Sequence, residues 1–215
     1  MEFISKNIEE YASLHSSAEP GVLQRLSRET QAKILKPRML SGHLQGRLLS
    51  FISRLVQPRC ILEIGTYTAY SAICLAEGLQ KGGLLHTIDH NAELEEFAVK
   101  YIKEAGYAGI IVQHIGEALE VLPGLDYSFD LVFIDADKEN YVNYFKLIFP
   151  KLRKGGIVLA DNALWSGKVC APEEEMDDET RGIHQFNTFI RAHDGVRHLL
   201  LPFRDGLMMI EKTAE

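Results

Sequence analysis

Cysteine is scarce in this chain of 215 residues, which has three, Cys60, Cys74 and Cys170, and no C-x-x-C pair. An odd number without that spacing argues against a disulfide framework and against a structural zinc site. Basic runs are also lacking, since 23 lysines and arginines stand against 30 acidic residues and the net charge is −7. Nucleic acid is therefore not expected as a partner, because its phosphates need a basic face.

Long apolar runs are missing as well. No stretch of about 18 consecutive apolar residues occurs, so neither a membrane span nor a membrane partner is expected. The N-terminus has no apolar stretch behind a basic start, which argues against a signal peptide. The composition, 46% hydrophobic and 25% charged, is typical of a folded globular chain. We therefore expect a soluble cytoplasmic protein.

The pattern of apolar residues changes about a quarter of the way along the chain. Before that point, helical spacing predicts helices over 2–15, 19–35 and 42–56. After it, short apolar runs alternate with segments of helical length. The runs are 60–65, 84–89, 110–115, 129–136 and 155–161, and the helical segments are 69–80, 91–105 and 138–149, with a shorter turn or helix at 116–122.

Strands that alternate with helices predict an α/β fold with a parallel sheet covered on both faces. The last two runs, 198–203 and 206–212, predict a hairpin and hence an antiparallel edge.

The acidic run at 173–179 is typical of a solvated loop or a helix start. We expect one domain over 1–215, with a helical cap over 1–57 and an α/β core over 58–215.

The fourth and fifth predicted strands both end in a carboxylate. The fourth predicted strand ends at Asp135 and the fifth at Asp161-Asn162, and ligands of open α/β sheets bind outside such carboxyl ends. If the strands are neighbours, the carboxylates lie about 5 Å apart and repel unless something positive lies between them. With the amide oxygen they form an oxygen-only set that suits Mg²⁺, Ca²⁺ or Mn²⁺. Each residue alone is more simply a helix cap, but the combination favours a cation.

The first predicted strand ends in a loop with a single glycine, Gly65, so the dinucleotide fingerprint G-x-G-x-x-G is absent. Thr66 and Tyr67 would hinder the close backbone approach that a pyrophosphate needs. Asp89 nevertheless ends the second strand, where a partner for a ribose hydroxyl is expected. A ligand with a ribose and no pyrophosphate fits both facts, and S-adenosylmethionine is such a ligand. Glu63 and Asp89 can also be solvated strand ends, and by its position Asp89 is the stronger candidate of the two.

Five segments carry a family resemblance. In order along the chain they are EIGTYTAYSA, TIDHN, GEAL, FDLVFIDADKENY and GGIVLADNALWSGKV. Together they resemble the cation-dependent O-methyltransferases of the catechol and caffeoyl-CoA type, over a span from about Lys36 to Lys212. The resemblance implies a class I, Rossmann-like methyltransferase fold: a seven-stranded, mostly parallel sheet with helices on both faces and a C-terminal antiparallel hairpin. It also implies S-adenosylmethionine as methyl donor, a divalent cation, Mg²⁺ before Ca²⁺ or Mn²⁺, and a homodimer.

The resemblance also assigns residues. The cation falls on Asp135, Asp161 and Asn162, the catalytic base on Lys138, and the wall of the acceptor pocket on Trp165. The cofactor contacts fall on Met39, Ser41, Glu63, Gly65, Thr66, Ser71, Asp89, Ala118 and Asp135.

The chain departs from the family pattern at three places. Ala69 stands where the family commonly has glycine, and we expect it to crowd the cofactor slightly and to favour the helix. Arg204 replaces another common glycine in the turn before Asp205. The segment MLSGHLQGRLL, with Met39 and Ser41, matches only loosely.

The implied reaction is methylation of a hydroxyl on a small aromatic vicinal diol, either catechol-like or hydroxycinnamoyl-like. A phenol has a pKa of about 10, and a bound cation stabilises the phenolate and orients two adjacent oxygens. Lys138 can accept the proton; the blander interpretation is a surface lysine at a helix start, where a cation is poorly placed. Two other functions remain: a nicotinamide-dependent oxidoreductase, which the missing glycines disfavour, and a non-catalytic binding protein, which the polar strand ends disfavour.

Overall fold

A computed structural model describes residues 5–214, and the chain divides into two compact units. The first is Lys6–Glu117, and the second extends from Ala118 to the end of the described chain. The N-terminal helices therefore belong to the same compact unit as the first three strands. In the part of the chain that the structure describes, no helix is long and apolar enough to cross a membrane.

The first unit consists of helices and three parallel strands in the order β3-β2-β1. Its strands are β1 (Cys60–Ile64), β2 (Leu84–Asp89) and β3 (Ile111–Ile115). Its helices are α1 (Lys6–Leu14), α2 (Gly21–Lys33), η1 (Pro37–Met39), α3 (Gly42–Val56), α4 (Tyr70–Ala76), η2 (Ala92–Leu94) and α5 (Glu95–Glu104). Every helix and strand predicted for this unit is present, although residues 2–4 of the first lie outside the described residues.

Close approach of α3 and α4 depends on two glycines. A Cβ on Gly46 would lie 2.6 Å from the ring of Tyr70, and one on Gly78 would lie 2.2 Å from the backbone of Ser53. Ser53 Oγ also donates to the carbonyl of Leu75 at 2.6 Å. Any larger side chain at either glycine would force the two helices apart.

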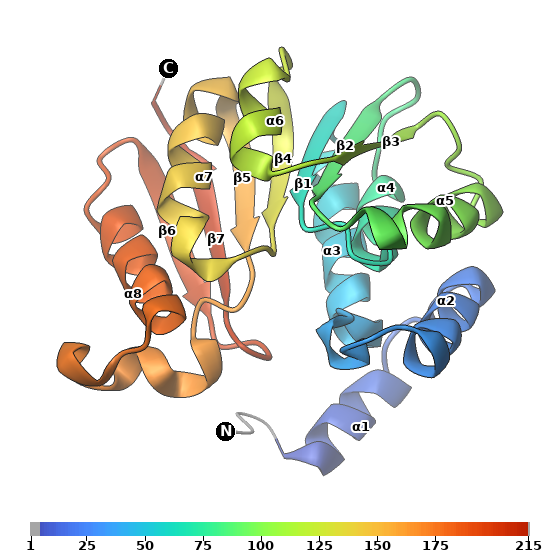
Figure 1. The fold of residues 1–215 in the computed structure, drawn as a ribbon, viewed down its shortest axis with the longest axis horizontal. Coiled ribbons are helices and arrows are strands. Elements are labelled where there is room, and N and C mark those ends of the chain that lie inside the picture. The colour runs from blue at the N-terminus through green and yellow to red at the C-terminus, as the bar shows by residue number, and fades with distance from the viewer. Residues whose placement is uncertain (1–4, 215) are drawn as a thin grey trace. The chain divides into compact units, whose positions relative to one another are not determined.

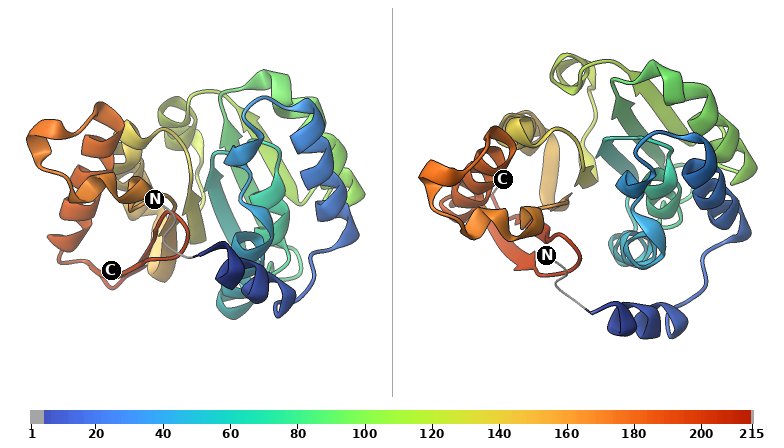
Figure 2. Two further views of the ribbon diagram at one scale, coloured as in Figure 1. Left: turned by 90° about the horizontal axis from the view of Figure 1, so that it is seen from below. Right: turned by 60° about the horizontal axis from the view of Figure 1, so that its bottom comes forward.

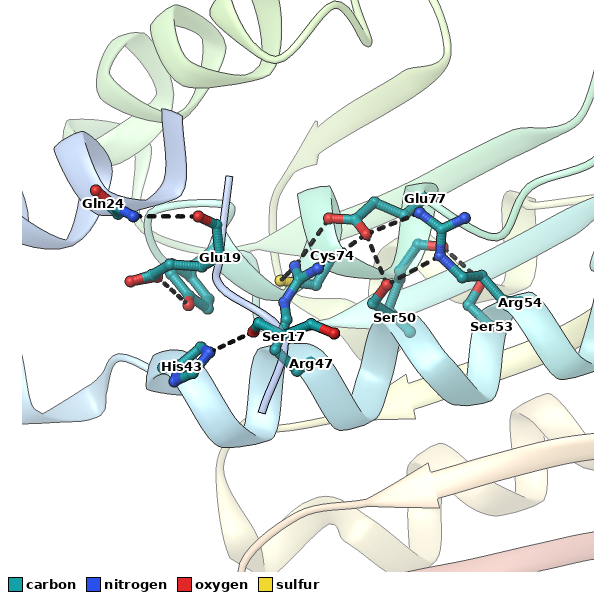
Figure 3. Close-up of polar contacts among 12 residues, drawn as sticks. Ser17, Glu19, Gln24, His43, Arg47, Ser50, Ser53, Arg54, Cys74 and Glu77 are labelled. Carbon is teal, nitrogen blue, oxygen red and sulfur yellow. Dashed lines mark hydrogen bonds and ion pairs between the residues drawn. The ribbon is translucent and has the colours of Figure 1, made fainter. Parts of the chain in front are cut away.

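A polar network joins the same two helices (Figure 3). Arg47 of α3 donates from both terminal nitrogens to Glu77, which follows α4, at 3.0 and 2.8 Å. Ser50 and Arg54 donate to the same carboxylate at 2.7 and 3.1 Å. The thiol of Cys74 lies 3.5 Å from Arg47, and burial, the largest influence, raises its pKa to about 12. The predicted helical cap is thus joined to the α/β part of its unit by charge-assisted hydrogen bonds.

The helix α2 lies beside α5 (Figures 1 and 2). Two exposed ion pairs join them, Arg25 to Glu104 at 3.0 Å and Lys100 to Glu29 at 3.0 Å. Exposed pairs of this kind contribute little to stability. The apolar side chains of Leu23 and Leu26, which are fully buried, hold α2 in place instead.

The second unit has four strands in the order β4-β5-β7-β6. They are β4 (Phe129–Ile134), β5 (Leu152–Ala160), β6 (Val196–Leu201) and β7 (Leu207–Lys212). The helices are α6 (Ala118–Gly124), η3 (Lys138–Asn140), α7 (Tyr141–Ile148), η4 (Phe149–Lys151), η5 (Trp165–Cys170), η6 (Glu173–Glu175) and α8 (Asp178–Arg191). β4 and β5 are parallel, and β7 is antiparallel to both β5 and β6, which confirms the predicted hairpin and antiparallel edge.

The apolar run of β4 lies in the core of the second unit. Residues 131–134 of β4 are all fully buried, and α7 and α8 lie side by side over the strands (Figure 1). The rings of Tyr141 and Phe145 meet that of Phe186 edge to face, with centroids 5.4 and 6.3 Å apart. The apolar run stops at Asp135 because the strand leaves this core there.

Candidate active site

The predicted adjacency of the two carboxylates is confirmed. Ile134 of β4 pairs with Ala160 of β5, so Asp135 and Asp161 follow paired residues on neighbouring parallel strands. The amide of Asp161 donates to the carbonyl of Ile134 at 2.9 Å, which continues the strand ladder by one residue. Asp161 is buried, and the side chain of Asp135 is about a quarter exposed.

Asn162 has a left-handed backbone with φ of 57°. Asparagine tolerates this region better than most residues. The backbone amide of Asn162 donates to Oδ1 of Asp161 at 2.9 Å, so the chain turns tightly directly after β5. Asn162 is therefore not the cap of a regular helix, which was the blander sequence interpretation for this residue.

Lys138 lies in η3, buried beside the carboxylates. Its Nζ donates to Oδ1 of Asp135 at 3.0 Å and to the hydroxyl of Tyr141 at 2.8 Å. Burial, the largest influence, lowers the pKa of Lys138, but Tyr141 and Asp135 together outweigh it and raise the pKa above its ordinary value. Gly182 of α8 lets that helix pack on η3, since a Cβ there would lie 2.6 Å from the Lys138 carbonyl. Lys138 is thus a buried lysine fixed by two hydrogen bonds, and not a surface lysine.

Two aromatic side chains complete this group. The ring of Trp165 lies 5.7 Å from Nζ of Lys138. The hydroxyl of Tyr141 donates to the carbonyl of Asp161 at 3.1 Å, so it connects the lysine to the end of β5. No local sequence pattern distinguishes a tyrosine that only packs in the core from one whose hydroxyl is in use, so the sequence carries no signal for this role of Tyr141.

In the first unit, the loop after β1 is built around Gly65. Its φ of 103° is favourable only for glycine, and its amide donates to the carbonyl of Ile88 at 2.9 Å. Glu63 is fully buried and accepts from Thr87 at 2.5 Å, and Thr87 lies 2.6 Å from the hydroxyl of Thr66. Glu63 is therefore not a solvated strand end, and it supports the loop through the two threonines.

Asp89, at the end of β2, is held in one orientation. Its Oδ2 accepts from the amide of Tyr67 at 2.7 Å and its Oδ1 from the amide of Asn91 at 2.9 Å. The hydroxyl of Tyr67 in turn lies 3.3 Å from the carbonyls of Leu35 and Lys36, just before η1. A carboxylate fixed by two backbone donors can still accept from a ribose hydroxyl, because each oxygen has two lone pairs.

The other predicted cofactor residues have varied surroundings. Ser71 is buried in α4, Ser41 is buried at the start of α3, and Met39 of η1 is 54% exposed. Ala118 is buried at the start of α6. The expectation that Ala69 favours the helix is wrong, because Ala69 precedes α4 with a left-handed φ of 67°.

The predicted donors for a cation are two carboxylates and one amide. In residues 5–214, no group of three or more histidine, cysteine, aspartate or glutamate side chains is placed to hold a metal ion. Asp135, Asp161 and Asn162 nevertheless fit a hard cation in kind, because all three offer oxygen. Such a site would need water or substrate oxygens to complete it.

Two solved O-methyltransferase structures share this fold. The O-methyltransferase TomG from Streptomyces achromogenes, in complex with SAM, is 31% identical with a TM-score of 0.90, over 97% of this chain and 96% of that one. An O-methyltransferase from Bacillus cereus, in complex with SAH, is 28% identical with a TM-score of 0.89, over 96% and 97%. The fold is thus the Rossmann-like fold of methyltransferases, as the sequence predicted.

The sequence comparisons narrow that class. A family model described as O-methyltransferase matches residues 13–213. A caffeoyl-CoA O-methyltransferase of Zea mays is 34% identical over 91% of this chain and 80% of its own length, and one of Stellaria longipes is 30% identical over 97% and 91%. The chain belongs to the O-methyltransferase family, and it is a methyltransferase. These matches do not favour the oxidoreductase or the non-catalytic alternative.

Proposed function

We propose that this enzyme transfers a methyl group from S-adenosylmethionine to one hydroxyl of a small aromatic vicinal diol, and that it needs a divalent cation, Mg²⁺ in the first place. The observation that supports the proposal is the pairing of β4 with β5, after which Asp135 and Asp161 follow paired residues and Asn162 comes next in the chain; we assign their side-chain oxygens to the cation. Support for the donor comes from the SAM and SAH complexes of the related O-methyltransferases. In the first unit, Gly65, Thr66 and Asp89 are the residues we assign to it.

A bound divalent cation would supply two things at this site: it would lower the pKa of the acceptor hydroxyl and orient its neighbour. Asp135, Asp161 and Asn162 are the residues that would hold it. Trp165 lies beside Lys138 and would offer one face to the aromatic ring of the acceptor.

Asp135 and Tyr141 favour the charged form of Lys138, which cannot accept a proton. A divalent cation held by the neighbouring carboxylates would disfavour that charge, and we assign the neutral Lys138 Nζ as the atom that then takes the hydroxyl proton.

The cation requirement is tested by methyl transfer to catechol, a hydroxycinnamate and its coenzyme A thioester, with EDTA and with added Mg²⁺. We expect activity to disappear in EDTA and to return with Mg²⁺, and Asp135→Ala and Asp161→Ala each to lower it by about 100-fold or more. Asp126→Ala, at an exposed position in the second unit, is the control and should keep wild-type activity. Full activity of the Asp135→Ala, Asp161→Ala double variant in EDTA would rule out the cation.

Lys138 is tested through turnover and donor affinity separately. We expect Lys138→Ala to lower kcat by about 100-fold, the usual contribution of a general base, and to leave the Kd of S-adenosylmethionine nearly unchanged. Lys146→Ala on the neighbouring helix α7 is a matched control, since that lysine contacts the ring of Phe189 instead. An unchanged kcat for Lys138→Ala would remove Lys138 from the reaction.

The resemblance also leads us to propose a homodimer. Light scattering on the purified protein should then give twice the 24.2 kDa of one chain. A mass of one chain at micromolar concentration would contradict this.

A further inference from the structure

The turn between β6 and β7 touches the loop that follows β5. The amide of Leu164 donates to the carbonyl of Asp205 at 2.8 Å, and that of Ala163 donates to Gly206 at 3.0 Å. A Cβ on Gly206 would lie 2.6 Å from the nitrogen of Leu164. This turn therefore packs directly against the backbone that carries Asn162.

The loop after β5 has an unusual backbone that needs such support. Asn162, Trp165 and Ser166 have φ values of 57°, 45° and 53°. A left-handed backbone costs about 1 kcal/mol or more for a residue with a side chain, and it persists only where the surroundings hold it. One such contact comes from Asp205, whose Oδ1 accepts from the amide of Ser166.

The second oxygen of Asp205 faces the side chain of Asn162. Asn162 Nδ2 lies 3.4 Å from Oδ2 of Asp205, a long hydrogen bond. An ionised carboxylate can only accept, so it favours the NH₂ end of the amide on its own side. The oxygen of Asn162 then points away from Asp205, which leaves it available to a cation.

We propose that Asp205 is a positioning residue for the cation site: it sets the orientation of the Asn162 amide and holds the loop that carries it. The inference rests on the proposed function, since it concerns the same site. Asp205 touches neither cation nor substrate in this role and acts only through Asn162. Orienting partners of this kind typically contribute about 10–100-fold to metal affinity.

Asp205→Asn isolates this role because the new side chain has nearly the same shape. Its amide oxygen can still accept from Ser166, but its NH₂ would then face Asn162. Two NH₂ groups cannot hydrogen-bond to each other, so the Asn162 amide would be favoured in the reversed orientation, with nitrogen toward the cation. We expect the Kd of Mn²⁺, measured by calorimetry and by the EPR signal of free Mn²⁺, to rise about 10-fold or more, while the melting temperature without metal stays close to that of the wild type.

Asp205→Glu and Asp126→Asn complete the experiment. Asp205→Glu restores a group that can only accept, so the Kd of this variant for Mn²⁺ should return toward the wild-type value even if the turn is less stable. If Asp205→Glu weakens Mn²⁺ binding as much as Asp205→Asn does, the inference is overturned. Asp126→Asn removes one exposed negative charge from the same unit and should change the Kd less than twofold. If the wild type binds no Mn²⁺, the proposed cation site itself fails; if the wild type binds and Asp205→Asn binds equally well, only the role of Asp205 fails.

Discussion

At the scale of single residues, backbone strain gathers in the two loops assigned to ligands. Tyr67 and Ala69 have positive φ after β1, as do Asn162, Trp165 and Ser166 after β5. Left-handed residues other than glycine cluster at functional sites in proteins. The clustering agrees with the proposed locations of the donor and the cation at these loops.

Ala69 gives a direct measure of that strain. Its φ of 67° costs about 1–2 kcal/mol for alanine and nothing for glycine. Replacing Ala69 by glycine removes this cost, but the greater freedom of glycine in the unfolded chain offsets part of the stability gained. We therefore expect Ala69→Gly to stabilise the protein by up to about 1 kcal/mol in urea unfolding. Ala72→Gly is the matched control, since Ala72 is equally buried but lies inside α4, and it should destabilise by about 1 kcal/mol. If both variants lower the free energy of unfolding equally, the backbone at Ala69 is not strained.

Some site residues could be predicted from the sequence and others could not. Asp135 and Asp161 were predictable because each ends a buried apolar strand, and consecutive strands are often neighbours. Asp205 was not, because it meets Asn162 across 43 positions of sequence and no local pattern records such a contact. The positive φ of Ala69 also has no signal in the residue itself.

At the scale of elements, the network between α3 and α4 carries a strong charge pair. The side chains of Arg47 and Glu77 are only 15% and 10% exposed, so removing one charge leaves the other poorly solvated. Removing one charge of a buried ion pair lowers the free energy of unfolding far more than removing one charge of an exposed pair. The network in Figure 3 is therefore a principal link between the N-terminal helices and the rest of the first unit.

We expect Glu77→Gln to lower the free energy of unfolding by about 2–4 kcal/mol at pH 7. Glu104→Gln breaks the exposed pair with Arg25 and should cost less than about 1 kcal/mol. Urea unfolding of both variants and the wild type measures the difference. Similar small losses for the two would mean that solvent screens the Arg47–Glu77 pair despite its burial.

The same carboxylate predicts a dependence on pH. Burial, the largest influence, raises the pKa of Glu77, but hydrogen bonds from Arg47 and Ser50 outweigh it and hold the pKa below its ordinary 4.5. The unfolded chain then binds more protons, so this contribution is fully present above pH 4.5 and is lost as pH falls below it. The stability gap between wild type and Glu77→Gln should therefore narrow below about pH 4.5, and a gap constant down to pH 3 would argue against the shift.

The helix α8 shows what the element predictions missed. The acidic run before it was assigned to a loop or a helix start, and Asp177 is indeed its N-cap, accepting from Thr180 at 2.8 Å. Ile183, Phe186 and Ile190 then recur at helical spacing and are fully buried. The signal for the helix was present in the sequence, but its charged start obscured the apolar stripe. This helix matters to the site because Gly182 brings it against Lys138.

At the scale of the whole molecule, the fold class was predictable because the strand and helix periods differ and alternate along most of the chain. The antiparallel end of the sheet followed from the turn at Arg204 and Asp205 between two apolar runs. No linker or change of composition marks residue 118, where the second compact unit begins, so the sequence carries no signal for that boundary.

Donor binding should stabilise the native state as a whole, since a ligand that binds only the folded form shifts the unfolding equilibrium. S-adenosylmethionine at 100 times its Kd should contribute about 2.7 kcal/mol, visible as a rise in melting temperature of a few degrees for a chain of this size. NAD⁺ at the same concentration should give no shift, because the loop after β1 has only Gly65 and lacks the other two glycines that a pyrophosphate needs. Asp89→Asn should shrink the shift, since it removes the charged acceptor held by Tyr67 and Asn91. A shift with NAD⁺ and none with S-adenosylmethionine would overturn the assignment of the donor.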